Sequence, residues 1–114
     1  MKQLQIKAGE VFIEDGEDPG PAYFLDSGKM TVFKNKGQEK IHIAEIHKGS
    51  IIGELSLIDN KPRSTTVKAL ENCVVTEIPR ESIKSIVQNK PEITLALIET
   101  LSERLRNTLR LLEK

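Results

Sequence analysis

The hydrophobic pattern divides the chain into a strand-rich first two-thirds and a helical last third. In the first part, short apolar or alternating runs are separated by turn sequences such as Asp15-Gly16, Ser27-Gly28 and Lys48-Gly49, a pattern typical of antiparallel sheets. The runs predicted as strands are Leu4–Ala8, Glu10–Ile13, Ala22–Leu25, Met30–Lys34, Lys40–Ile46, Ser64–Leu70 and Cys73–Ile78. Short strands spaced by about 8–12 residues indicate a barrel or a sandwich.

The last third changes to a helical pattern. Pro79 is predicted to open a short helix that runs to about Gln88, and Pro91 to open a longer helix that continues to the end of the chain, since proline suits the first helical position. We therefore predict one domain over residues 1–114, mainly β, with a barrel over residues 1–79 and C-terminal helices over residues 80–114.

The charge balance argues against broad attraction to polyanions. Seventeen basic residues match 17 acidic ones, so no overall field draws the chain to nucleic acid or to an anionic membrane. No apolar run approaches the ~20 residues of a membrane span, and the polar start at Met1 does not resemble a signal peptide. We expect a cytosolic protein with no membrane partner that holds any anion through a local arrangement of donors.

The residues that bind metals or attack substrates are scarce. Cys73 is the only cysteine, which excludes a disulfide framework or a thiolate zinc site, and its apolar surroundings predict a buried structural role. His42 and His47 are the only histidines and would face opposite sides of a regular strand. We therefore expect no metal site of the kind that a cupin enzyme needs and no catalytic residues.

The most informative segment covers residues 53–66. Gly53 ends an apolar strand and is followed by Glu54 and a predicted short helical turn; a second turn then leads to Arg63 and to the hydroxyl residues Ser64, Thr65 and Thr66. Glycine and the start of a helix can present backbone N–H groups to an anion, and an arginine matches phosphate oxygens. Glu54 would repel a phosphate but can accept a hydrogen bond from a ribose hydroxyl.

This segment resembles the phosphate-binding cassette of the cyclic-nucleotide-binding domains, which share the pattern Gly-Glu-Leu-(small)-Leu…Pro-Arg-(Ser/Ala)-(Ala/Thr). These domains occur in catabolite-activator-type regulators, kinase regulatory subunits and gated channels. The resemblance extends over nearly the whole chain, through Gly9-Glu10-Val11, Tyr23–Gly28 and Met30-Thr31-Val32. It implies a double-stranded β-helix, or jelly-roll, barrel with C-terminal helices that binds a cyclic nucleotide without acting on it chemically.

The resemblance also implies which residues contact the ligand. Arg63 would pair with the cyclic phosphate, Glu54 would accept the ribose 2′-hydroxyl, and backbone N–H groups near Ser56, Ser64 and Thr65 would complete the anion site. The expected ligand-contacting set is Gly53, Glu54, Leu55, Ser56, Arg63, Ser64, Thr65, Ile43, Ala44, Met30, Val32, Arg104 and Thr108.

The part of the pocket around the base follows from the same resemblance. Ile43 and Ala44, with Met30 or Val32, would form its apolar wall. Ser64 directly after Arg63 favours cyclic AMP over cyclic GMP, since family members that select guanine often have threonine there. No further cofactor is expected.

The C-terminal helix suggests a second function for its own surface. Ile98, Leu101, Leu105, Thr108 and Leu112 recur at spacings of three, four, three and four, which is a coiled-coil seam with one polar member. A homodimer through the helix over residues 91–113 is the preferred interpretation, and burial against its own barrel is the alternative.

Arg104 and Thr108 lie one helical turn apart. By resemblance, Thr108 matches a base-contacting threonine and Arg104 a neighbour of Glu54, although a solvated helix face remains an alternative for Arg104.

Two alternative interpretations of the whole chain remain at this point. In the first, Glu54 and Arg63 form a surface ion pair and the chain is an oligomerisation scaffold with a relic pocket. In the second, the pocket is functional, and the chain is a stand-alone sensor or a module of a larger protein. No helix-turn-helix sequence is seen, so we expect no DNA binding by this chain alone.

Overall fold

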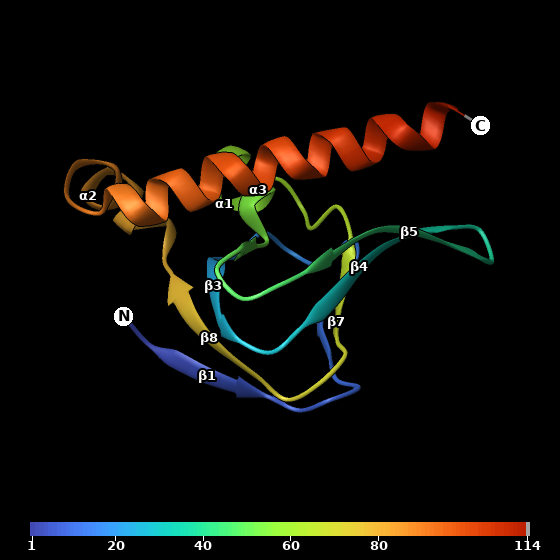
Figure 1. The fold of residues 1–114 in the computed structure, drawn as a ribbon, viewed down its shortest axis with the longest axis horizontal. Coiled ribbons are helices and arrows are strands. Elements are labelled where there is room, and N and C mark those ends of the chain that lie inside the picture. Colours follow the sequence, from blue (N-terminus) through green and yellow to red (C-terminus); the bar gives the residue numbers. More distant parts are fainter. Residues whose placement is uncertain (114) are drawn as a thin grey trace.

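The computed structural model describes residues 1–113, and it consists of two antiparallel sheets with helices packed along one side (Figure 1). The first sheet has the strand order β1 (Gln3–Ile6), β8 (Cys73–Ile78), β3 (Ala22–Ser27) and β6 (Ile51–Ile52). The second has the order β2 (Val11–Ile13), β7 (Thr66–Ala69), β4 (Met30–Lys36) and β5 (Glu39–Ile46). The predicted mainly β fold with C-terminal helices is confirmed, with the strands in two sheets and not in one closed barrel.

The alternation of apolar residues along the strands builds a core between the two sheets. Its buried members are Ile6, Ile13, Leu25, Met30, Val32, Ile46, Ile52, Val67, Ala69, Cys73 and Val75. The predicted burial of Cys73 is confirmed: its thiol donates to the carbonyls of Lys29 at 3.3 Å and Glu71 at 3.2 Å, and burial raises its pKa. This cysteine is therefore part of the packing.

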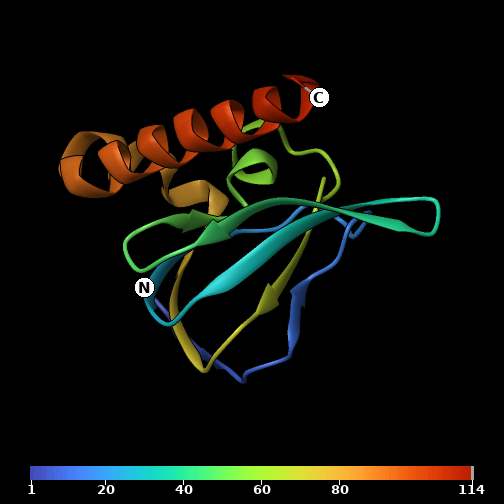
Figure 2. The ribbon, with the colours of Figure 1, turned by 45° about the vertical axis from the view of Figure 1, so that its right-hand side comes forward.

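Several strand boundaries differ from those predicted. β7 begins at Thr66, two residues later than expected, because Ser64 and Thr65 belong to the irregular segment that lines the candidate site. The β4–β5 hairpin is longer than predicted and projects beyond the rest of the second sheet (Figure 2). The two-residue strand β6 pairs with β3 and leads directly into Gly53.

The helical elements are α1 (Glu54–Asp59), a 3₁₀ turn over Arg80–Ser82, α2 (Ile83–Asn89), α3 (Pro91–Arg110) and a final 3₁₀ turn over Leu111–Glu113. Pro91 stands in the first turn of α3, as predicted. Pro79 remains extended, with φ −65° and ψ 147°, so the first predicted helix begins after it. Lys114 lies outside the described residues. Over residues 1–113, no helix has the length and apolar character needed to cross a membrane.

A second apolar cluster holds the helices against the first sheet. Ala22, Ile51, Leu57, Ile78 and Ile86 form its buried part, and the N-terminal half of α3 packs on it through Ile93, Ala96 and Leu97. The C-terminal half of α3 runs past this cluster towards β5 (Figure 1). The two halves of the helix therefore differ in how firmly apolar packing attaches them to the sheets.

Thr100 links α3 to β6, the strand that precedes the segment over residues 53–66. Its side chain is buried, and its hydroxyl oxygen accepts a hydrogen bond of 3.0 Å from the backbone N–H of Ile51 in β6. Because a buried N–H without a partner is costly, this contact fixes the position of α3 along β6.

The Thr100 contact can be tested by a change that preserves its shape. We expect Thr100→Val to lower the free energy of unfolding by about 1–3 kcal/mol, since it leaves the Ile51 N–H buried without an acceptor. Thr100→Ser, which keeps the hydroxyl, should cost clearly less. Urea denaturation followed by circular dichroism measures both, and equal stability of the Val and Ser variants would show that the hydrogen bond is unimportant.

Candidate functional site

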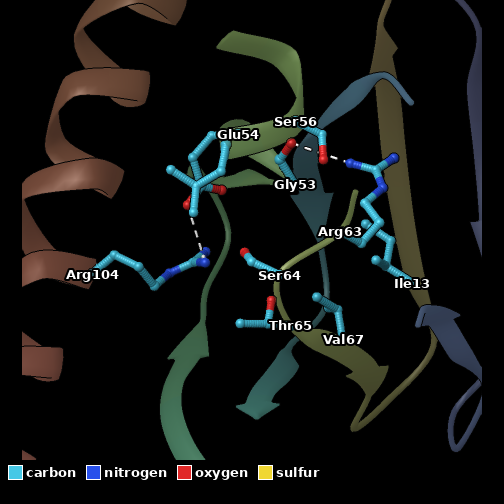
Figure 3. A pocket seen from close by; sticks show the side chains of 10 residues that line it. Ile13, Gly53, Glu54, Ser56, Arg63, Ser64, Thr65, Val67 and Arg104 are labelled. Atoms are coloured by element: carbon cyan, nitrogen blue, oxygen red, sulfur yellow. Dashed lines mark hydrogen bonds and ion pairs between the residues drawn. The ribbon is translucent and has the colours of Figure 1, made fainter. Parts of the chain in front are cut away.

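A cavity lies between the N-terminal end of α1, the irregular segment before β7, and α3 (Figure 3). Its lining residues are Ile13, Gly53, Glu54, Leu55, Ser56, Arg63, Ser64, Thr65, Val67 and Arg104. It therefore gathers Glu54, Arg63 and Arg104, which come from α1, the loop before β7 and α3. Binding of one nucleotide by both Glu54 and Arg63 requires the two side chains to line one cavity, and they do.

Two glycines make room for the guanidinium of Arg63. Gly53 precedes α1 in the left-handed region, with φ 73° and ψ 28°, where other residues are strained. A Cβ atom at Gly53 would lie 2.6 Å from Arg63 Nη1, and one at Gly20 would lie 2.8 Å from Arg63 Nη2. The absence of side chains at Gly20 and Gly53 is therefore a packing requirement of the buried arginine.

Arg63 is a buried cation without a paired anion. It is 7% exposed, and its Nη1 and Nη2 donate to the backbone carbonyls of Gly53 at 3.2 Å and Pro21 at 2.8 Å. Within residues 1–113, its Nε meets no acceptor and no carboxylate lies at ion-pair distance from it. Burial lowers the pKa of Arg63, opposed by Tyr23 and Glu17. A buried guanidinium held only by neutral acceptors is suited to receive an anion.

Glu54 is paired with Arg104. Its side chain is 1% exposed, and its Oε1 lies 3.1 Å from Arg104 Nη1. The two groups lie within ion-pair distance, but their geometry is not that of a hydrogen bond. Neither carboxylate oxygen of Glu54 accepts a hydrogen bond from the part of the chain that is described. Arg104 thus occupies the place beside Glu54 that the resemblance predicted, and the carboxylate keeps unused acceptor capacity.

The hydroxyl residues have different surroundings. Ser56 is buried and its hydroxyl donates to the carbonyl of Lys61 at 2.8 Å, which holds the turn after α1. Ser64 is exposed and Thr65 is half-buried; in Figure 3 both lie between the two arginines. The carbonyl of Ser64 accepts a hydrogen bond of 2.9 Å from Lys34 Nζ, so a side chain of β4 helps to position this segment.

The structure places part of the predicted base wall away from this cavity. Met30 and Val32 are fully buried between the sheets, because their positions in β4 point inward, and neither lines the cavity. Ile43 packs against the same core. Ala44 is buried and lines a small adjoining space together with Arg104. Contact of these four residues with a base remains a prediction.

Thr108 also lies apart from the cavity. It is exposed, and its hydroxyl donates to the carbonyl of Arg104 at 2.9 Å. Its contact with a base remains a prediction. Ile13 and Val67, which no sequence motif singles out, are the apolar lining residues from β2 and β7. The signal available for them was their inward positions in these strands.

The cavity is small in this structure. Its volume of about 20 Å³ accommodates roughly one water molecule, whereas sites for small molecules measure about 300–1,000 Å³. Arg104 reaches across the opening to Glu54 (Figure 3). A larger ligand therefore needs more space than this arrangement of Arg104 and Glu54 leaves.

The family model of the cyclic nucleotide-binding domain matches residues 3–90. The chain belongs to this family. Among solved structures, the catabolite activator protein of Thermus thermophilus has a TM-score of 0.81 and 25% identity, over 98% of this chain and 53% of that one. The cyclic-AMP-bound form of the EAL enzyme Bd1971 has a TM-score of 0.72 and 26% identity, over 98% and 30%. The jelly-roll fold of such domains is thereby shown for this chain.

The curated relatives are much longer proteins. Lysophospholipase NTE1 of Pyricularia oryzae is 28% identical over 107 residues, which are 93% of this chain and 7% of the relative. The relative of the same description from Chaetomium globosum is 26% identical, again over 7% of its length. The chain therefore spans about 7% of the length of these curated relatives.

The Glu54–Arg104 pair predicts a compensating pair of mutations. Arg104→Ala should lower the free energy of unfolding by about 3 kcal/mol, because it leaves a buried carboxylate uncompensated. Adding Glu54→Gln should restore most of that loss by removing the charge. Urea denaturation of the wild type, both single variants and the double variant gives the coupling free energy. Strictly additive effects would contradict a direct interaction.

Proposed function

We propose that the chain is a non-catalytic, cytosolic regulatory domain that binds a cyclic nucleotide, cyclic AMP in preference to cyclic GMP. The buried Arg63 guanidinium without a paired anion carries this proposal. The cavity lining contains two guanidinium groups and one carboxylate, so one positive charge is uncompensated. A cyclic phosphodiester supplies one negative charge.

The contacts of Arg63 suggest how the phosphate would bind. Its two terminal nitrogens donate to the neutral carbonyls of Gly53 and Pro21, and charge-assisted bonds to phosphate oxygens are about twice as strong as such neutral bonds. Exchange of these partners for phosphate oxygens would compensate the buried charge. Ser64 also lines the cavity, and its hydroxyl would be a further donor to the phosphate.

Glu54 would bind the sugar. Its carboxylate accepts no hydrogen bond from residues 1–113, and a ribose hydroxyl is a donor of suitable size and neutrality. Because Arg104 approaches the same oxygen, the sugar and Arg104 would have to share or exchange places at Glu54. A ligand with different affinities for the two arrangements would shift α3 between them.

Two observations support the choice of cyclic nucleotide and the absence of chemistry. Ser64 follows Arg63, and by the resemblance already described a serine at this position favours cyclic AMP. The similar protein Bd1971 has been solved in forms bound to cyclic AMP and to cyclic GMP. The cavity lining includes neither histidine nor cysteine. The lysophospholipase relatives are matched over 7% of their length, so we propose a regulatory role and do not transfer their activity.

The outer face of α3 supports a homodimer. Leu95, Ile98, Leu105, Leu109 and Leu112 are each more than half exposed, between 51% and 78%, and they recur at helical spacing along one side. The opposite side faces the sheets through Thr100 and Arg104. A second copy of this helix would cover the exposed stripe in a coiled-coil arrangement.

The ligand assignment is tested by replacing Arg63. We expect Arg63→Ala to weaken binding of cyclic AMP and of cyclic GMP at least tenfold, because both ligands contain the same cyclic phosphate. Hydrogen bonds to charged groups contribute about 1.5–3 kcal/mol. Arg63→Lys should also weaken binding, since the planar fork is lost. Isothermal titration calorimetry measures the affinities, with Lys61→Ala as a control for an exposed cation on the same loop.

The same titration distinguishes a domain that binds a cyclic nucleotide from an oligomerisation scaffold. Absence of heat and of any thermal shift with millimolar cyclic AMP or cyclic GMP would overturn the proposal and favour an oligomerisation scaffold with a closed pocket. Wild-type affinity in Arg63→Ala would overturn the anion site.

The homodimer is tested by introducing a charge into the stripe. Leu105→Glu should convert a dimeric wild type into a monomer, because two carboxylates would meet at the seam. Val87→Glu, an exposed apolar residue of α2, is the matched control and should remain dimeric. Light scattering coupled to size-exclusion chromatography gives the mass, and a monomeric wild type would refute the dimer.

A further inference from the structure

A turn near the start of the chain holds two points of the loop that leads into β7. The Gly16 N–H donates to the carbonyl of Arg63 at 2.9 Å, and the Arg63 N–H donates to the carbonyl of Glu17 at 2.8 Å. The Asp15 N–H donates to the hydroxyl of Thr66 at 3.1 Å. The backbone of Arg63 and the side chain of Thr66 are therefore fixed, with two residues of the loop between them.

Lys34 of β4 holds the peptide group between those two points. Its Nζ donates to the carbonyl of Ser64 at 2.9 Å and lies 3.1 Å from Oδ2 of Asp15. The side chain of Asp15 is 18% exposed, and the backbone of the same residue makes the contact to Thr66. The ammonium group is thus fixed between a carboxylate of the turn and a carbonyl of the loop.

The orientation of the Ser64 carbonyl decides the orientation of the next N–H. The Ser64–Thr65 peptide bond is trans, so its C=O and its N–H lie in one plane and point in opposite directions. Rotation of that plane would reverse both groups while the residues on either side stay in place, because the two adjoining backbone torsions are soft. Lys34 opposes this rotation by holding the carbonyl.

Lys34 acts from outside the cavity. Ser64 and Thr65 are among the lining residues, and Lys34 is not. Since the Ser64 carbonyl points towards Lys34, the Thr65 N–H points away from it, where a phosphate bound beside Arg63 would be an acceptor. The ammonium group itself already has an anionic partner in Asp15, so it does not require the ligand for charge compensation.

We infer that Lys34 is a positioning residue for the bound phosphate, an inference that rests on the proposed cyclic-nucleotide function. Through the Ser64 carbonyl it fixes the Thr65 N–H in the orientation that donates to a phosphate oxygen, and Asp15 keeps the ammonium group in place. Lys34 itself does not touch the ligand in this assignment. Because cyclic AMP and cyclic GMP contain the same phosphate, the contribution is equal for both.

Calorimetric titration of the 114-residue chain with cyclic AMP and cyclic GMP tests this role. Lys34→Met keeps the unbranched side chain and removes its donors, so it should weaken binding of both nucleotides by the same factor, about 2- to 12-fold, the range for one hydrogen bond. Lys34→Arg, which retains donors and charge, should recover most of the affinity. The matched control is Lys36→Met, which removes an exposed lysine from the same strand and should bind as the wild type does.

Replacement of Asp15 distinguishes positioning from long-range attraction. If Lys34 positions the loop, Asp15→Ala weakens binding about twofold or more, because the ammonium group loses one of its two partners. If Lys34 only attracts the phosphate by its charge, removal of the neighbouring negative charge strengthens binding. Nuclear magnetic resonance of isotope-labelled protein gives a second measure. Cyclic AMP should shift the Thr65 amide proton of the wild type, and Lys34→Met should reduce that shift.

The outcomes separate this inference from the function on which it rests. If the wild type binds neither nucleotide, the proposed function fails and the role of Lys34 fails with it. If the wild type binds but Lys34→Met binds as tightly, or Asp15→Ala binds more tightly, the function stands and the positioning role is refuted. Equal weakening by Lys36→Met also refutes it, since the effect would then be one of net charge. Thermal unfolding of each variant confirms that changes in affinity occur in folded protein.

Discussion

The Glu54 carboxylate is buried, and the guanidinium of Arg104 in α3 is the cation that lies at ion-pair distance from it. Burial of a lone carboxylate costs several kcal/mol or more, so the ion pair constrains where α3 can lie. Thr100 lies one helical turn before Arg104 on α3. Its hydroxyl accepts a hydrogen bond from the N–H of Ile51, on the strand that leads into Gly53. Two polar links, from neighbouring turns of one helix, therefore join α3 to the segment that forms the site.

The site also contains a buried positive charge, that of Arg63, which the Glu54–Arg104 ion pair does not neutralise. Arg63 is held by backbone carbonyls, in space left by Gly20 and Gly53, and its charge has no partner among residues 1–113. An anion bound there would stabilise the folded protein by neutralising a charge whose burial is already built into the fold. In the proposed function, the cost of burying Arg63 would thus favour the binding of an anion at this site.

The attachment of α3 gives a physical basis for signalling. Its N-terminal half packs on the apolar cluster around Ile51 and Ile86, while its C-terminal half is joined to α1 through the Arg104–Glu54 ion pair. Polar contacts of this kind can be exchanged for contacts to a ligand at small net cost, whereas apolar packing cannot. The outer side of the same half carries exposed leucines, so ligand binding and self-association, as proposed, would both act on this helix.

The sequence alone determined the strand pattern, the start of α3 at Pro91, the burial of Cys73 and the cassette-like segment, because each depends on local periodicity or on residues close together in the chain. It did not determine that Met30 and Val32 point into the core, since a period of two groups residues by face without identifying the face. The role of Thr100 likewise depends on the rotation of α3, where one residue corresponds to about 100°. The small size of the cavity was also decided by tertiary structure, because Glu54 and Arg104 lie 50 positions apart and only the packing of α3 brings their charges together.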